Sequence, residues 1–187
     1  MLTFTNQAAL SYRNRVRYSN LTTGQIADTL TVTKEALTGT YGPEEDVTYV
    51  VRLENNGAAP LADLTLTDDL GGYAFDQATL YPLSYKADSL HYYVNGAAQP
   101  APAVTPGAPL TVSGISVPAG GNALIVYEAS VTAFASPAED GSIVNTVSVS
   151  GGGLTAPVTA SATITAAAGP ELALTKSLVP EIGRAHV

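Results

Sequence analysis

Lys34 is the side chain whose chemical surroundings need the most explanation in this sequence. Residues 30–34 alternate between apolar and polar types, as expected for a β-strand with one buried face. Because successive side chains of a strand point to opposite faces, Lys34 shares its face with Leu30 and Val32. A lysine in an apolar core costs free energy unless another group neutralises it or bonds to it. We therefore expect the core to contain a partner for Lys34.

Two more polar residues fall on inward faces by the same argument. Asp68 alternates in phase with the leucines two and four residues before it, and Asn145 alternates in phase with its apolar neighbours. Asp69 takes the place of Asp68 if the strand register slips by one residue, and Glu128 is a further acidic candidate. Burial in an apolar core favours the uncharged forms of an amine and of a carboxylic acid.

Other residue types that carry chemistry are poorly placed. His91 has no serine nucleophile motif near it, and His186 lies in a tail that resembles a translated sequencing adapter. The acidic groups at 44–46 and 68–69 lack the regular spacing of oxygen ligands in a calcium loop. The glycines at 151–153 follow a strand but open no helix, so they predict a hairpin turn and not a phosphate-binding loop. We expect no cofactor and no metal.

A group of tyrosines offers a second kind of site. Tyr92 and Tyr93 lie in a predicted strand, and three further tyrosines occur within the preceding 20 residues. Such a cluster could form a face that binds a glycan or a peptide. It could equally be ordinary cross-strand packing.

The elements that position these residues are predicted to be strands alone. No segment has an apolar stripe at helical spacing over three turns, so we predict an all-β chain with an Ig-like β-sandwich. The expected strands cover residues 4–12, 15–20, 30–34, 46–53, 61–70, 90–94, 110–117, 123–133, 142–150 and 154–165.

Composition narrows the classes of function. Of 187 residues only 13% are charged, and the formal net charge is −8. An acidic chain repels phosphate backbones, so we expect no nucleic acid partner. The sequence contains no cysteine, which excludes disulfides and thiolate metal sites. The first residues lack the basic start and apolar run of a secretory signal.

The sequence repeats itself. Residues 6–11 resemble residues 145–150, and residues 30–34 resemble residues 172–176. We therefore predict a tandem array. Its parts are a hairpin over 1–29 that resembles the closing strands of a preceding repeat, and a complete sandwich over 30–168. A linker and first strand of a truncated next repeat follow over 169–180, and then a non-native tail over 181–187.

Several segments resemble a bacterial surface repeat known as domain of unknown function eleven. They are Lys34 and residues 41–49, 53–57, 64–70 and 143–146. The same landmarks are similar to CnaA-like domains of Gram-positive adhesins and pilins. In those domains a lysine of the first strand is joined to an asparagine of the last strand, with an acid beside them. The resemblance implies tandem sandwiches that act as stalks or adhesive surfaces outside the cell.

The resemblance and the inward faces together predict one cross-link. Lys34 and Asn145 are expected to form an isopeptide bond, with Asp68 as the assisting acid. A neutral Lys34 amine would attack the Asn145 side-chain carbonyl, and ammonia would leave. This is a single self-processing event and not enzymatic turnover. The alternative is a buried Lys34–Asp68 ion pair that is hydrogen-bonded to Asn145.

The sequence thus predicts a structural or adhesive repeat at the cell surface or outside the cell. Its expected partners are neighbouring repeats, a second copy bound through the N-terminal hairpin, and a host or glycan ligand. The alternative function is a binding module that uses the tyrosine-rich face.

Overall fold

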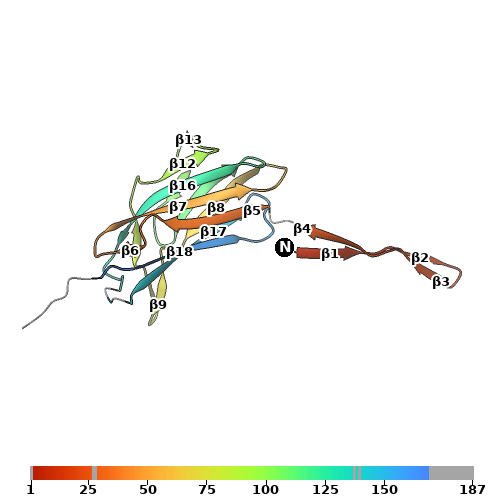
Figure 1. The fold of residues 1–187 in the computed structure, drawn as a ribbon, viewed down its shortest axis with the longest axis horizontal. Coiled ribbons are helices and arrows are strands. Elements are labelled where there is room, and N and C mark those ends of the chain that lie inside the picture. The colour runs from red at the N-terminus through yellow and green to blue at the C-terminus, as the bar shows by residue number, and fades with distance from the viewer. Residues whose placement is uncertain (1, 27–28, 137, 139, 169–187) are drawn as a thin grey trace, which may run out of the picture.

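The computed structural model describes residues 2–26, 29–136, 138 and 140–168. Two six-stranded sheets pack face to face, and no helix occurs in these residues (Figure 1). The prediction of an all-β sandwich is therefore confirmed. The predicted linker, next strand and tail over 169–187 lie outside the described residues.

The first sheet contains Lys34. Its strand order is β13-β12-β16-β7-β5, with β11 also paired to β16. The bounds are β5 (Leu30–Ala36), β7 (Asp46–Asn55), β11 (Leu83–Tyr85), β12 (His91–Val94), β13 (Ala97–Gln99) and β16 (Asn122–Val131). In β5 the inward positions are Leu30, Val32 and Lys34, which alternate with exposed residues as the sequence pattern predicts.

The second sheet contains the other two inward polar residues. Its strand order is β14-β15-β8-β17-β18-β6. The bounds are β6 (Thr40–Tyr41), β8 (Leu61–Asp68), β14 (Ala103–Thr105), β15 (Leu110–Val117), β17 (Ser142–Gly151) and β18 (Val158–Ala166). The β18–β6 pair is parallel, and the other pairs in both sheets are antiparallel.

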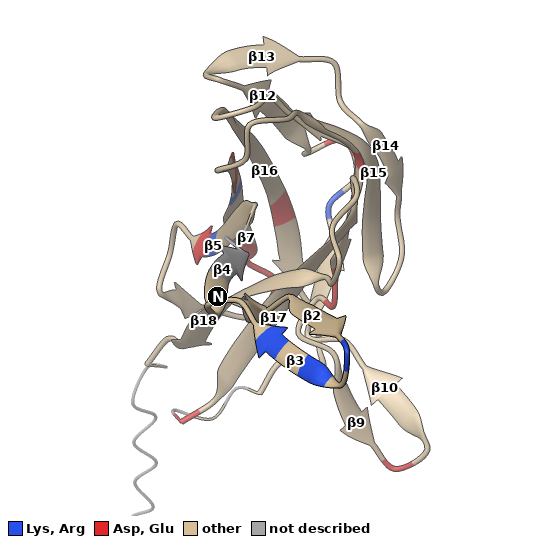
Figure 2. Cartoon of the chain, turned by 90° about the vertical axis from the view of Figure 1, so that its right-hand side faces the viewer, with Lys and Arg blue, Asp and Glu red and all other residues tan. Residues whose placement is uncertain are grey.

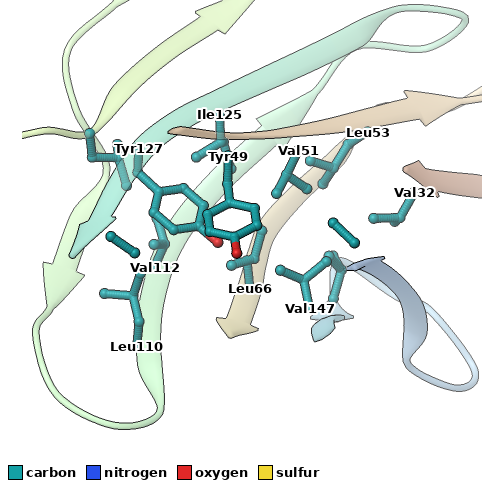
Figure 3. Close-up of a cluster of buried hydrophobic side chains, with 14 of the residues drawn as sticks. Val32, Tyr49, Val51, Leu53, Leu66, Leu110, Val112, Ile125, Tyr127 and Val147 are labelled. Carbon is teal, nitrogen blue, oxygen red and sulfur yellow. The ribbon is translucent and has the colours of Figure 1, made fainter. Parts of the chain in front are cut away.

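The core lies between the sheets and is made from alternate residues of the long central strands. In β7 and β16 every second side chain is buried, and aromatic and branched side chains fill the space (Figure 3). In β8 the alternation is broken at Asp63, which has a φ of 56°. Leu61 and Leu64 are consequently both buried although they differ in parity, as a bulge allows.

The shortest strands are not predicted by the sequence pattern. Strands of two or three residues, such as β6, β13 and β14, show no measurable alternation, and none of these three is among the predicted strands. The same is true of β9 (Tyr73–Phe75) and β10 (Ala78–Leu80), which form a small separate hairpin. The predicted strand over 90–94 ends in a turn at Asn95-Gly96, where both residues have positive φ (48° and 80°), as is common for Asn-Gly hairpins.

The N-terminal residues form a ribbon that pairs with neither sheet of the sandwich. β1 (Leu2–Asn6) pairs with β4 (Thr22–Ile26), and β2 (Ala9–Tyr12) pairs with β3 (Arg15–Tyr18). Both residues of the turn between β2 and β3, Arg13 and Asn14, have positive φ. The ribbon extends away from the sandwich, and its basic residues lie at β3 (Figures 1 and 2).

Candidate cross-link site in the sandwich core

Lys34 reaches across the core from one sheet to the other. Its Nζ donates a hydrogen bond to Oδ2 of Asp68 at 2.8 Å, and both side chains are fully inaccessible to solvent. Lys34 comes from the edge strand β5, and Asp68 is the last residue of β8. The structure therefore brings together the lysine and the acid that the alternation places inward.

The Asp68 carboxylate is held by donors on both oxygens. Oδ2 accepts from Lys34 and also from the hydroxyl of Tyr127 in β16. Oδ1 accepts from the backbone N–H of Leu70 at 2.9 Å. These bonds fix the plane of the carboxylate and keep one oxygen directed at the amine.

Asn145 lies beside this pair on the inner face of β17. Asp68 is directly opposite Val147 in the β8–β17 ladder, and Asn145 is two residues from Val147 on the same face. Asn145 is thus the diagonal neighbour of Asp68. It is fully buried, and neither its side-chain oxygen nor its side-chain nitrogen has a hydrogen-bond partner. An unpaired buried amide is rare because it costs the full free energy of desolvation.

Two tyrosines complete the surroundings of the amine. The rings of Tyr49 and Tyr127 stack with their centroids 5.7 Å apart (Figure 3). Lys34 Nζ lies 4.8 Å from the centroid of the Tyr49 ring, within the range of a cation–π contact. The Tyr127 hydroxyl is bonded to Asp68, whereas the Tyr49 hydroxyl is buried without a partner.

Burial dominates the electrostatics of the site. It lowers the pKa of Lys34, and the attraction and hydrogen bond of Asp68 oppose this shift. Burial also raises the pKa of both Tyr49 and Tyr127, so their hydroxyls stay protonated near neutral pH. The Asn145 side chain lowers the pKa of both tyrosines and so opposes the effect of burial. Its amide therefore lies near the two phenols. No side-chain hydrogen bond of Asn145 has formed, however.

The two other acidic candidates have different partners. Asp69 accepts hydrogen bonds from the backbone N–H groups of Gly71 and Thr146, both at 2.9 Å, and so ties the end of β8 to β17. Glu128 lies on the outer face of β16, where it accepts from Lys86 at 2.6 Å. In this strand register Asp68 faces Lys34, whereas Asp69 and Glu128 do not.

The predicted tyrosine-rich face is not a single face. Tyr92 and Tyr93 are consecutive residues of β12 and point to opposite sides of the sheet. Tyr92 is buried, and its hydroxyl donates to the carbonyl of Ser116 at 2.7 Å and accepts from the Ser116 N–H. The exposed His91 lies on the same side as Tyr93. His186 lies outside the described residues.

Two other features, a metal site and a membrane-spanning helix, are absent from the described residues. Within the described part of the chain, no three His, Asp or Glu side chains are grouped so that they could hold a metal ion. Among the same residues there is also no helix of the length and hydropathy needed to span a membrane.

Sequence reasoning missed Tyr49 and Tyr127 as members of the site. The signal was present, because Tyr49 alternates in phase with Val47 and Val51 in a strongly β-forming segment. Parity alone gives the face of a side chain, however, and not its neighbour in the opposite sheet. The stagger of the two sheets decides that neighbour.

Comparison with solved structures finds a similar fold in three bacterial pilins. The pilus backbone RrgB of Streptococcus pneumoniae superposes with a TM-score of 0.51 and 13% identity over 66% of this chain and 31% of that one. For the major pilin subunit BcpA of Bacillus cereus, the TM-score is 0.52 and the identity 10%, over 86% and 48%. For the major pilin SpaD of Corynebacterium diphtheriae, the values are 0.50 and 12%, over 71% and 34%.

These similarities confirm the predicted likeness to pilin domains at the level of the fold. This chain spans less than half the length of each of the three pilins. No protein-family model matches the sequence, and no curated protein matches it. Membership of domain of unknown function eleven therefore stays a prediction.

Proposed function

We propose that residues 30–168 form a load-bearing repeat of a stalk or adhesin outside the cell, closed by an isopeptide bond between Lys34 and Asn145. The observation that carries this proposal is the buried Lys34–Asp68 pair beside an asparagine whose amide has no partner. A core built only for stability would satisfy that amide or replace it with an apolar residue. The fold shared with pilins supports the same role.

The proposed reaction begins with the ion pair. Lys34 passes a proton to Oδ2 of Asp68 along their 2.8 Å hydrogen bond, which leaves a neutral amine and a carboxylic acid. The amine attacks the side-chain carbon of Asn145 while the protonated Asp68 polarises the carbonyl oxygen. As the tetrahedral intermediate collapses, the second proton lost by the amine goes to the leaving group. The products are a secondary amide, ammonia and protonated Asp68.

The charge state of the pair makes this transfer accessible. The ion pair and the neutral pair contain the same number of protons, so no proton has to enter from solvent. Burial disfavours the charged form of Lys34 and lowers its pKa, which reduces the free-energy cost of forming the neutral amine. Low accessibility also keeps water away from the carbon under attack.

The cross-link would change how the domain carries tension. A bond from β5 to β17 bypasses the 110 residues that lie between Lys34 and Asn145 in the sequence. Force applied at the two ends would then pass through the amide and not through the strand ladders. Such a unit suits a stalk that contains no disulfides.

Single-molecule stretching tests this function. The parent protein, held at its ends, should not release the length between the two linked residues, which is roughly 370–400 Å when extended. Asn145→Ala should release that length at a force at which the parent stays folded. The proposal is overturned if the parent extends as far as the variant.

The N-terminal ribbon supports a second part of the proposal, association with another sandwich of the same kind. Its large apolar side chains are at least half exposed: Phe4, Leu10, Tyr12, Val16, Tyr18 and Leu21. A two-stranded ribbon is at best marginally stable in water without cover. Its charged residues are all arginines, whereas all 16 Asp and Glu of the chain lie after residue 26. Apolar contact and opposite charge therefore both favour docking on a second copy.

The alternative function as a glycan- or peptide-binding module lacks comparable support. Tyr92 uses its hydroxyl inside the protein, and Tyr93 alone faces the hollow formed with Arg52 and Asn122. A glycan array distinguishes the two functions. A stalk repeat should give no saturable signal, whereas a binding module should give one that Tyr93→Ala removes.

A further inference from the structure

The unpartnered hydroxyl of Tyr49 is the group in this core that the proposed reaction does not yet use. Tyr49 is 0% exposed and its hydroxyl has no hydrogen-bond partner. The hydroxyls of the other two fully or nearly buried tyrosines of the first sheet, Tyr92 and Tyr127, are both bonded. A buried hydroxyl without a partner costs free energy, so its position needs a reason.

Tyr49 lies next to the residues that would react. The Tyr49 ring lies against Lys34 Nζ, with 4.8 Å between the nitrogen and the ring centroid. Asn145 is near enough to influence the pKa of Tyr49, and its amide is likewise buried and unpartnered. A donor and an acceptor thus lie side by side in a dry core without being bonded to each other.

We propose that Tyr49 is a catalytic residue of isopeptide formation, and that its hydroxyl donates a hydrogen bond to the oxygen of Asn145 when that oxygen becomes an oxyanion. This inference rests on the proposed function. When Lys34 Nζ adds to the side-chain carbon of Asn145, the carbon becomes tetrahedral and its oxygen moves and gains charge. A donor that is unpaired before the reaction and paired in the transition state lowers the barrier without stabilising the ground state.

In the proposed reaction the protonated Asp68 polarises this oxygen, and Tyr49 would add a second donor to it. The Tyr127 hydroxyl is engaged with Asp68 Oδ2, and Asp68 Oδ1 is engaged with the Leu70 N–H. Lys34 supplies the attacking nitrogen. Tyr49 is therefore the tyrosine of this cluster that can give the oxyanion a second donor, in addition to protonated Asp68, without losing an existing bond. Burial raises its pKa, so the proton needed for this bond is present at neutral pH.

The test compares Tyr49→Phe with a matched variant elsewhere. The full chain is made by cell-free translation, synthesis is stopped with an inhibitor, and samples are quenched in acid at intervals. Intact-mass measurement gives the fraction that has lost one ammonia. Tyr49→Phe keeps the ring that stacks on Tyr127 and should slow the loss by roughly 10²-fold, the effect of removing one oxyanion donor in other enzymes. Tyr92→Phe removes a buried hydroxyl that is bonded to Ser116 and takes no part in the proposed reaction, and this variant should react at the parental rate.

Stability gives a second, independent readout. In a Lys34→Met background, where no bond can form, Tyr49→Phe should leave the melting temperature unchanged or raise it, because it removes an unpaired polar group. Tyr92→Phe should lower it. The inference is overturned if Tyr49→Phe reacts as fast as the parent, or if it lowers the melting temperature as much as Tyr92→Phe does. A parent that keeps its full mass overturns the proposed function instead.

Discussion

β17 and the N-terminal β1 contain closely related sequences in very different surroundings. Asn145 in β17 and Asn6 in β1 occupy matching positions of the repeated pattern, and each strand is part of an antiparallel hairpin. Asn145 is covered by the opposite sheet and lies next to Asp68. Asn6 is exposed on a ribbon that neither sheet covers.

The difference shows what makes an asparagine a candidate for cross-linking. An exposed amide is hydrated, has no amine held nearby, and gains nothing from reacting. A buried amide meets a desolvated amine and an acid that can move protons, because the second sheet supplies both. The strand pattern is thus necessary for the site, and the cover provided by the sandwich is what makes it reactive.

The largest expected effect comes from preventing the bond. Asn145→Ala should lower the free energy of unfolding by roughly 4–5 kcal/mol, the value that the chain-entropy model gives for closing a loop of this length. Lys34→Ala should cost more, because it also leaves the buried Asp68 without its counter-charge. Urea unfolding of the variants measures both effects.

Asn6→Ala is the matched control for this comparison. It removes the same side chain from the uncovered copy of the pattern and should change neither the loss of one ammonia nor the free energy of unfolding. If Asn6→Ala and Asn145→Ala had equal effects, the comparison between the two strands would fail.

Removing the ribbon should affect association more than folding. A chain without residues 1–26 should melt at the parental temperature, because the ribbon shares no ladder with either sheet. It should sediment as a smaller species if the ribbon docks on a second copy. Replacing Arg13, Arg15 and Arg17 with serine should weaken association in part, most clearly at low salt. Sedimentation that is identical for parent and truncated chain would rule out this partner.

The pH dependence of stability should differ between bonded and unbonded protein. In Asn145→Ala the Lys34 amine is free, and its pKa in the folded state is below the ordinary value of 10.5. Between these two values the unfolded chain binds more protons, so stability should rise with pH through that window. In the parent the nitrogen is an amide and cannot titrate, so this rise should be absent.

Unfolding measured from neutral to alkaline pH checks this prediction. Tyr49 and Tyr127, whose pKa values burial raises, act in the opposite direction above about 10. They are present in both proteins, so the difference between the two curves isolates Lys34. Parallel curves would show that the parent amine is also free.

The smallest effect is expected at the surface. Lys86 contacts Asp46 and Glu128 at 2.6 Å each on the outer side of the first sheet. Its hydrogen bond holds the pKa of Asp46 below the ordinary value. The resulting stability is present above the ordinary pKa of an aspartate and is lost as pH falls through the folded-state value. Lys86→Ala should shift the melting temperature only slightly, and less at high salt, because all three groups are exposed. A shift as large as that of Asn145→Ala would show that surface pairs, and not the core, set the stability.

Much of the fold and part of the site follow from the sequence for physical reasons. The alternation of residues 30–34 and 64–68 fixes which side chains face inward, because a strand has a period of two. It therefore identifies Lys34 and Asp68 and predicts that they need each other. The turn at Arg13-Asn14 is equally local, since it depends on two residues with positive φ.

The remainder depends on the packing of one sheet on the other. Tyr49 and Tyr127 are inward residues of strands that the sequence identifies, but nothing local places them around Asp68. The same limit explains the tyrosine-rich face: proximity in sequence suggested one surface, whereas the pleat divides Tyr92 from Tyr93. The bulge at Asp63 likewise arises from pairing between strands and not from a local signal.

The most direct test of the cross-link is the mass of the folded parent protein, followed by peptide mapping. The account predicts a mass lower by one ammonia than the sequence requires, and a branched peptide that joins the segments containing Lys34 and Asn145. Lys34→Ala, Asn145→Ala and Asp68→Ala should each restore the full mass, and Asn6→Ala should not. A parent protein at its full mass, with both segments recovered as separate peptides, would contradict the account.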